Sequence, residues 1–296
     1  MKKTIYIILF ALLCVAVNAF AGLPSVSQME VTDVTPASFA VTWVSSEPAT
    51  GALALYQSDC VTPITGLVST SEGNDTTGVI RVTVSGLSAD AVYCYQASTV
   101  SKSTAEVALS PSQPAAVLTA RMVVRSMTTG TALVPFGNDL LRAPAVSGAA
   151  DGVLEVLYLT GGKDPVSLLL TNDITKQYFN MNNLFDAATG STFNLTGGES
   201  VRISERHGIS GCVIDRFRKV PADLETTGVR DLVGTPRIQD IDFNGTVNIL
   251  DVLRAVGGAG TAAGDVCYNS DLDMMGHNKV DSTDVQSVIG SFDAIP

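Results

Sequence analysis

Oxygen-bearing side chains recur at alternate positions near the C-terminus, in residues 240–251. Alternate residues of a tight loop turn their oxygens toward one point, and a hard cation such as calcium takes about six to eight of them. Gly245 permits the sharp turn, and Val247 is expected to plug the core beneath the loop. The sequence therefore predicts a calcium site with these ligands: Asp240, Asp242, Asn244, the backbone carbonyl of Thr246, Asn248 and Asp251.

A second copy of the pattern follows at a shift of 33 residues, which aligns Asn248 with Asp281 and Asp251 with Asp284. The chain therefore contains an internal repeat. Read from Asp271, the second loop is two residues longer than the first, and Met275 stands where an oxygen ligand is expected. The predicted ligands of this weaker or altered site are Asp271, Asp273, Asp281 and Asp284.

Each loop leads into one short amphipathic segment, residues 251–256 and residues 284–292, unlike the helix-loop-helix of an EF-hand. The two loop–helix units resemble a type I dockerin domain, over residues 236–296. The resemblance implies two units packed around two calcium ions and a helix surface that docks onto a cohesin-like partner, in extracellular polysaccharide-degrading assemblies. The residues at its partner-reading positions are Ile249, Leu250, Ser282 and Thr283, so the two faces are not equivalent.

Short alternating apolar runs separated by turn residues predict an antiparallel β-sandwich over residues 22–120. The only tryptophan, Trp43, lies in mid-strand, and Tyr93 follows Leu87 at the spacing of a tyrosine corner. This part resembles a fibronectin type III domain, although Ala89 stands where that family usually has proline. A spacer is the simplest role for it and a ligand-binding module is the alternative, because a fold alone does not give a function.

Residues 121–235 continue as a β-rich domain of no recognised family, with strands predicted at 152–159 and 166–170. The fold class is therefore mainly β: a fibronectin-like sandwich, a second sandwich-like domain and a small α-helical calcium-loop domain. The middle domain also carries the one basic cluster of the chain. A solvated strand face is the simplest interpretation, and an acidic glycan or an acidic neighbouring domain are alternatives. The cluster consists of Arg202, Arg206, Arg216, Arg218 and Lys219.

Residues 1–21 have the charged start, apolar run and small-residue end of a secretory signal peptide, which predicts a secreted protein. No later stretch is long and apolar enough for a membrane span. Four cysteines then remain in an oxidising compartment, so disulfides are expected. The fibronectin resemblance implies a bond between Cys60 and Cys94, which leaves Cys212 to pair with Cys267.

The formal net charge is −11, too acidic for a general nucleic-acid binder. These observations predict a secreted non-catalytic modular protein that binds calcium and docks onto an extracellular partner. One alternative is a carbohydrate-active hydrolase with its active site in the middle domain, where Glu155, Glu199 and Glu205 supply carboxylates. The other is an architectural surface or matrix protein.

Overall fold

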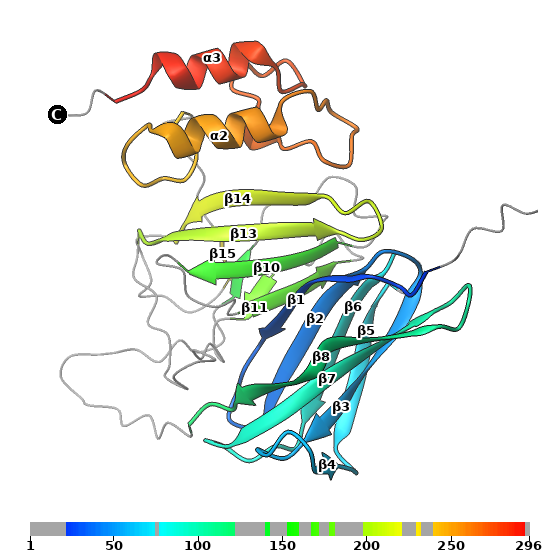
Figure 1. Cartoon of the computed structure of the whole chain (residues 1–296). Coiled ribbons are helices and arrows are strands. Elements are labelled where there is room, and N and C mark those ends of the chain that lie inside the picture. The colour runs from blue at the N-terminus through cyan, green and yellow to red at the C-terminus, as the bar shows by residue number, and fades with distance from the viewer. Residues whose placement is uncertain are drawn as a thin grey trace, which may run out of the picture.

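The chain is mainly β, as predicted, with two α-helices at the C-terminal end of the part described (Figure 1). Within that part, no helix is both long and apolar enough to cross a bilayer. The predicted signal peptide lies outside the described residues. The computed structural model describes residues 22–74, 77–121, 140–142, 153–159, 167–171, 178–180, 198–220, 229–231 and 239–293.

The first part of the chain forms two four-stranded antiparallel sheets, in the orders β1-β2-β6-β5 and β4-β3-β7-β8. This arrangement is an immunoglobulin-like sandwich, in agreement with the alternating pattern of the sequence. The strands are β1 (Val26–Thr32), β2 (Ser38–Ser45), β3 (Ala49–Tyr56), β4 (Pro63–Ile64), β5 (Val68–Asn74), β6 (Val79–Ser85), β7 (Val92–Ser101) and β8 (Val107–Leu118).

Trp43 fills the space between these sheets, as its mid-strand position predicted. It is fully buried in one apolar cluster with Phe39 and Val41, and its indole N–H donates to the hydroxyl of Thr99 at 2.9 Å. The hydroxyl of Tyr93 accepts a hydrogen bond from the backbone N–H of Ser88 at 2.9 Å, which is the bond expected of a tyrosine corner.

Gly51 lies directly against Trp43, and an added Cβ would overlap its ring and the side chain of Ile80. We expect Gly51→Ala to lower the free energy of unfolding by about 1–3 kcal/mol, because a packed core has no room for an extra methyl group. Denaturant unfolding followed by tryptophan fluorescence measures this loss. Gly257→Ala, where no heavy atom lies within 4 Å of the added Cβ, is the control and should cause no such loss.

The middle of the chain forms a four-stranded antiparallel sheet, in the order β11-β10-β13-β14, and a three-stranded sheet, β12-β9-β15, in which β15 runs parallel to β9. The antiparallel sheet is consistent with the predicted second sandwich, and both predicted strands are present as β10 and β11. The strands are β9 (Leu140–Arg142), β10 (Val153–Leu159), β11 (Ser167–Thr171), β12 (Tyr178–Asn180), β13 (Ser200–His207), β14 (Val213–Lys219) and β15 (Val229–Asp231).

The first sandwich contacts this middle sheet through Arg206 of β13. A β-bulge in β1 gives Gln28 a positive φ of 53°, and its carbonyl accepts from the Arg206 guanidinium at 2.8 Å. The same guanidinium contacts the Glu30 carboxylate and the Tyr158 hydroxyl. Arg206 is therefore a buried side chain that connects two parts of the chain through hydrogen bonds and an ion pair.

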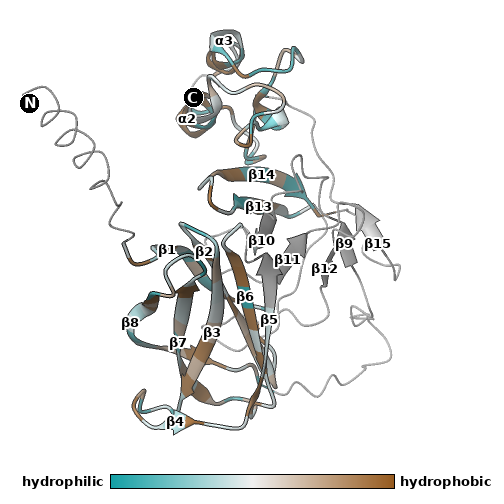
Figure 2. Ribbon diagram, turned by 90° about the vertical axis from the view of Figure 1, so that its right-hand side faces the viewer, coloured by the Kyte–Doolittle hydropathy of each residue, from teal (hydrophilic) through white to brown (hydrophobic). Residues whose placement is uncertain are grey.

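The C-terminal part contains α2 (Ile249–Gly258), the short 3-10 helix η3 (Ser270–Leu272) and α3 (Ser282–Gly290). Both α-helices begin two residues before the predicted starts at 251 and 284, because Asn248 and Asp281 cap them. The side chain of each cap residue accepts a hydrogen bond from a backbone N–H of the first turn. In return, the carboxylates of Asp251 and Asp284 accept from the backbone N–H of the cap residue. Figure 2 shows both helices stacked beyond the edge strand β14.

Both disulfides pair as expected. Cys60 is bonded to Cys94 within the first sandwich, and Cys212 to Cys267 across 55 residues. The second bond joins the β13–β14 hairpin to the loop between α2 and η3. Two disulfides agree with the predicted oxidising compartment.

Candidate metal centre and docking face

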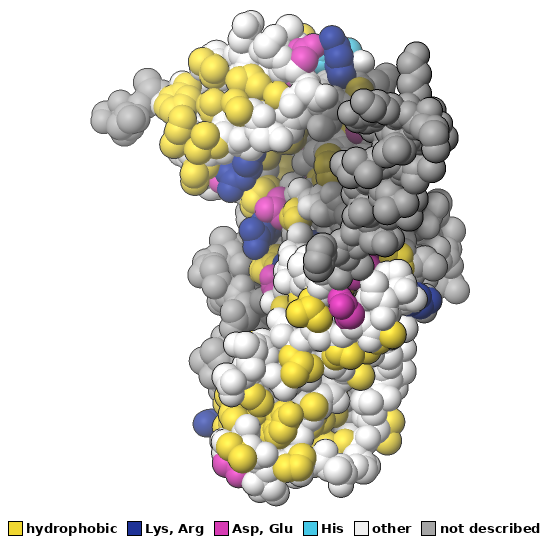
Figure 3. Space-filling view, turned by 45° about the vertical axis from the view of Figure 1, so that its right-hand side comes forward, with side chains coloured by type: hydrophobic (Ala, Val, Ile, Leu, Met, Phe, Trp, Pro, Cys, Tyr) yellow, Lys and Arg dark blue, Asp and Glu magenta, His cyan; other side chains and the backbone are white. Residues whose placement is uncertain are grey.

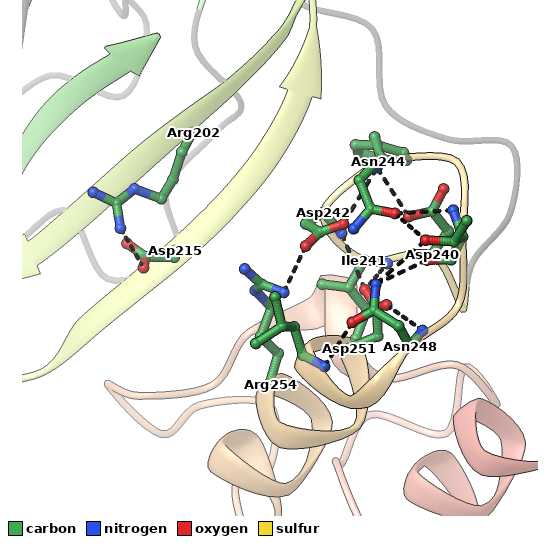
Figure 4. Close-up of polar contacts among 12 residues, drawn as sticks. Arg202, Asp215, Asp240, Ile241, Asp242, Asn244, Asn248, Asp251 and Arg254 are labelled. Atoms are coloured by element: carbon green, nitrogen blue, oxygen red, sulfur yellow. Dashed lines mark hydrogen bonds and ion pairs between the residues drawn. The ribbon is translucent and has the colours of Figure 1, made fainter. Parts of the chain in front are cut away.

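Three carboxylates of the first loop, those of Asp240, Asp242 and Asp251, gather with their oxygens within 4.8 Å of one another. The backbone holds them in place: Asp240 accepts from the N–H groups of Asn244 and Gly245, at 3.1 and 2.9 Å. Figure 4 shows these side chains turned toward one point of the loop. The sequence therefore named correctly the residues that the loop brings together.

The remaining predicted ligands of this loop line the same turn. The Asn244 side-chain oxygen accepts from the N–H and hydroxyl of Thr246, at 2.9 and 2.7 Å. The Asn248 side-chain oxygen accepts from Leu250 N–H at 2.8 Å, so its first role is to cap α2. Val247 is 1% exposed and belongs to the core beneath the loop, as predicted.

The charge of the loop is balanced only in part. Arg254 of α2 bonds Asp242 at 2.8 Å, and its guanidinium lies over the ring of Phe217, 4.7 Å from the centroid. The pKa of Asp240 is raised, first by burial and then by the repulsion of Asp251 and Asp242. A divalent cation would relieve that repulsion, and the donor set of carboxylate, amide and carbonyl oxygens suits calcium.

The second loop has the same length as the first, which corrects the expectation that it is two residues longer. Asp273 accepts from the N–H groups of His277 and Asn278, at 3.0 and 2.7 Å, as Asp240 does from the residues four and five positions on. Asp284 accepts from Asp281 N–H at 2.8 Å. The loop therefore runs over residues 273–284, and its cluster consists of Asp273, His277 and Asp284.

Asp271 lies outside this cluster, in η3, so its predicted role as a calcium ligand does not agree with the structure. Its carboxylate takes two bonds from the Arg218 guanidinium, at 2.7 and 3.1 Å, and Arg216 lies 3.6 Å away. Asp271 and Asp273 were both candidates for the first ligand of the second loop. The 33-residue shift that aligns Asn248 with Asp281 also aligns Asp240 with Asp273, and so selects Asp273.

The basic cluster is mostly not a solvated strand face. Arg216 and Arg218 bind the C-terminal part through Asp271, whereas Arg206 binds the first sandwich through Glu30. Arg202, paired with Asp215 at 3.4 Å and 40% exposed in its side chain, fits the simplest interpretation. Lys219, at the end of β14, is half-buried. The alternative of an acidic neighbouring domain is therefore correct for the two arginines of β14.

Helix α2 presents an apolar face that no described residue covers. Ile249, Leu250, Leu253 and Val256 are 50–58% exposed, and their spacing of three and four places them on adjoining positions of the helix surface. Figure 3 shows hydrophobic side chains gathered on this helical end of the molecule. We call these four residues the α2 face; the predicted docking residues Ile249 and Leu250 belong to it.

The corresponding positions of α3, at the 33-residue shift, are Ser282, Thr283, Gln286 and Ile289, all exposed. Three of the four are polar. The predicted difference between the two helix surfaces is therefore present, and the structure adds Leu253 and Val256, which were not among the predicted docking residues. Their exposure depends on which side of α2 packs against the C-terminal core, and the spacing of apolar residues in the sequence did not determine that side.

The middle domain shows no arrangement for sugar hydrolysis among its described residues. Glu205 is fully buried and paired with Arg216, so a polysaccharide has no access to it. Burial raises its pKa, although the positive charge of Arg216 opposes the shift. The side chain of Glu155 lies outside the described residues, and Glu199 is only partly exposed at the start of the sheet.

No family model matches the chain, and no curated protein matches it. A solved marsupial T cell receptor is similar over 68% of this chain and 95% of its own, at 12% identity and a TM-score of 0.23. A similarity that weak assigns neither a family nor a function.

Proposed function

We propose that this is a secreted, non-catalytic modular protein whose C-terminal part is dockerin-like and binds a cohesin-like extracellular partner in a calcium-dependent way. The observation that carries the proposal is that the first loop runs directly into the helix that bears the α2 face. Asp251 belongs to the carboxylate cluster and is also the third residue of α2. A cation in the loop would therefore fix the start of the helix that carries the apolar residues.

The fibronectin-like sandwich and the middle domain fit a spacer. The contacts of Arg206 with the first sandwich and the Cys212–Cys267 bond with the C-terminal part connect all three parts. Such connections hold the docking helix at a defined distance from the N-terminal end. Attachment to a polysaccharide-degrading or cell-surface assembly is the role that this arrangement supports.

We expect Leu253→Asp to abolish partner binding, because a carboxylate at the middle of the α2 face would be buried without a counter-ion. The loss should exceed tenfold in dissociation constant. Gln286→Asp, at the corresponding position of α3, is the matched control and should bind within about twofold of the unchanged protein. Surface plasmon resonance against a panel of immobilised cohesin domains, in calcium and in EGTA, measures both.

Binding that persists in EGTA, or that Gln286→Asp damages more, would contradict this assignment. Self-association through the α2 face, seen by analytical ultracentrifugation without any cohesin binding, would favour the architectural alternative instead.

A further inference from the structure

The two loops share a backbone but differ in the side chains that point into them. Shifting by 33 residues replaces Asp242 with Met275, Asn244 with His277 and Thr246 with Lys279. The backbone conformation is the same in both loops at the positions with a positive φ. The fourth residue of each loop has a positive φ, 55° in Phe243 and 66° in Gly276. The sixth residue does too, as Asn278 at 63° shows. The second loop therefore has the backbone of the first loop but different side chains at the positions where the first loop has oxygen ligands.

The imidazole of His277 lies among the three carboxylates of its loop. Its Nδ1 is 2.8 Å from Asp273, and its Nε2 is 3.3 Å from Asp281 and 4.0 Å from Asp284. The ring therefore bridges Asp273 and Asp281 with its two nitrogens. Lys279 pairs with Asp281 as well, at 2.7 Å.

The first loop lacks such a group. Its one cationic contact, Arg254, touches Asp242 from the helix, while Asp240 and Asp251 accept from backbone N–H groups in the bonds that the structure shows. No described cation bridges two of its carboxylates. Among the described residues, the two loops therefore differ in what faces their carboxylates: Arg254 reaches one carboxylate of the first loop, whereas His277 and Lys279 face those of the second.

The oxygen count points the same way. Met275 is 61% exposed and offers no oxygen, and His277 would have to leave its two carboxylates before an ion could enter. Three carboxylates and the Lys279 carbonyl would remain, in a loop where calcium takes about six to eight oxygens.

We infer that His277 and Lys279, which already contact the carboxylates of the second loop, take the place of a metal ion there, so that the chain binds one calcium ion rather than two. This inference rests on the proposed calcium binding of the first loop. It makes the C-terminal part a calcium-dependent unit, carrying the α2 face, joined to a calcium-independent unit, anchored by Asp271 to β14.

Native mass spectrometry and isothermal titration calorimetry on the full secreted chain, stripped with EGTA and titrated with calcium chloride, test the inference. We expect one equivalent of calcium in the unchanged protein, none in Asp240→Asn, and one in Asp273→Asn. The double variant Met275→Asp/His277→Asn, which gives the third and fifth positions of the second loop the residue types of the first, should take up two.

Two equivalents in the unchanged protein, or loss of an equivalent in Asp273→Asn, would overturn the inference and leave the proposed function standing. So would a tight equivalent of zinc chloride that His277→Asn removes, because the loop would then be a nitrogen–oxygen metal site. If the unchanged protein binds no calcium while the double variant binds one, the second loop is metal-free as inferred, but the proposed calcium binding of the first loop, and with it the proposed function, falls. The Asp240→Asn and Asp273→Asn results decide the matter should the double variant fail to fold.

Discussion

Asp240→Asn/Asp251→Asn is expected to remove the whole stabilisation that calcium gives this protein. A ligand that binds only the folded state stabilises it by about 2.7 kcal/mol at one hundred times its dissociation constant, and by about 4.1 kcal/mol at one thousand times. The variant loses two of the three carboxylates that converge in the first loop. We expect the loop, left with one carboxylate, not to bind calcium at millimolar concentration.

Asparagine is the right replacement because these carboxylates also hold the backbone. Asp251 accepts from Ile241 N–H with one carboxylate oxygen and from Asn248 N–H with the other, both at 2.9 Å, and asparagine keeps the size of the side chain and one of these two acceptors. The apo variant should therefore be moderately less stable than the apo parent, and the calcium-dependent shift of each protein is the quantity to compare.

Differential scanning calorimetry in calcium and in EGTA measures this difference, with circular dichroism to follow helix content. Asp273→Asn/Asp284→Asn, the same change at the same positions of the second loop, is the control and should keep the calcium-dependent shift. A second-loop variant that is the more damaged in its calcium response would show that the ligands are assigned to the wrong loop. Equal unfolding of the parent in calcium and in EGTA would refute calcium binding altogether.

The sequence predicted the features that depend on residues close together in the chain. Alternate oxygens with Gly245 located the first loop, and the fold brings together the carboxylates it named. The strand runs around Trp43 predicted the sandwich because one face of each strand is buried, a period that any core must impose. The cysteine pairs followed from the resemblance and from there being only four cysteines to pair.

What the sequence did not decide depends on contacts between distant segments. Alternation at Arg216 and Arg218 shows that both lie on one face of β14, but it does not say that Asp271, more than 50 residues later, lies against them. Because this tertiary contact was not predictable from the sequence, Asp271 was wrongly predicted to be a calcium ligand. A carboxylate near the start of an acidic loop can serve a cation or an arginine, and only tertiary packing decides which. The domain limits at residues 120 and 235 and the sandwich form of the middle domain remain predictions.

Arg216→Ala should be the most destabilising substitution at the joint between β14 and the C-terminal part. Arg216 is 5% exposed in its side chain and bonds the fully buried carboxylate of Glu205. Its guanidinium also reaches Ser270 at 3.3 Å. Removing one partner of a buried ion pair costs roughly 3–5 kcal/mol, because the other charge stays buried without compensation. Among the described residues, the other oxygen of Glu205, Oε2, has no hydrogen-bond partner.

The loss should depend on pH in a direction fixed by Glu205. Burial already raises its pKa in the folded protein, and the variant lacks the opposing charge of Arg216, so the pKa rises further. A group whose folded pKa lies above its unfolded value binds more protons in the folded state. The variant should therefore be least impaired below the unfolded pKa of about 4.3 and lose stability as the pH rises through the folded pKa.

Urea unfolding of the full chain between pH 4 and pH 8 measures this profile. Arg216→Ala/Glu205→Gln removes both charges and should recover part of the stability at pH 7 while losing the pH dependence. Arg202→Ala, on the same sheet with a partner that is 37% exposed, is the control and should cost less than about 1 kcal/mol at any pH. If Arg216→Ala is as mild as Arg202→Ala, then Glu205 has access to water and the joint is not the closed interface that these contacts describe.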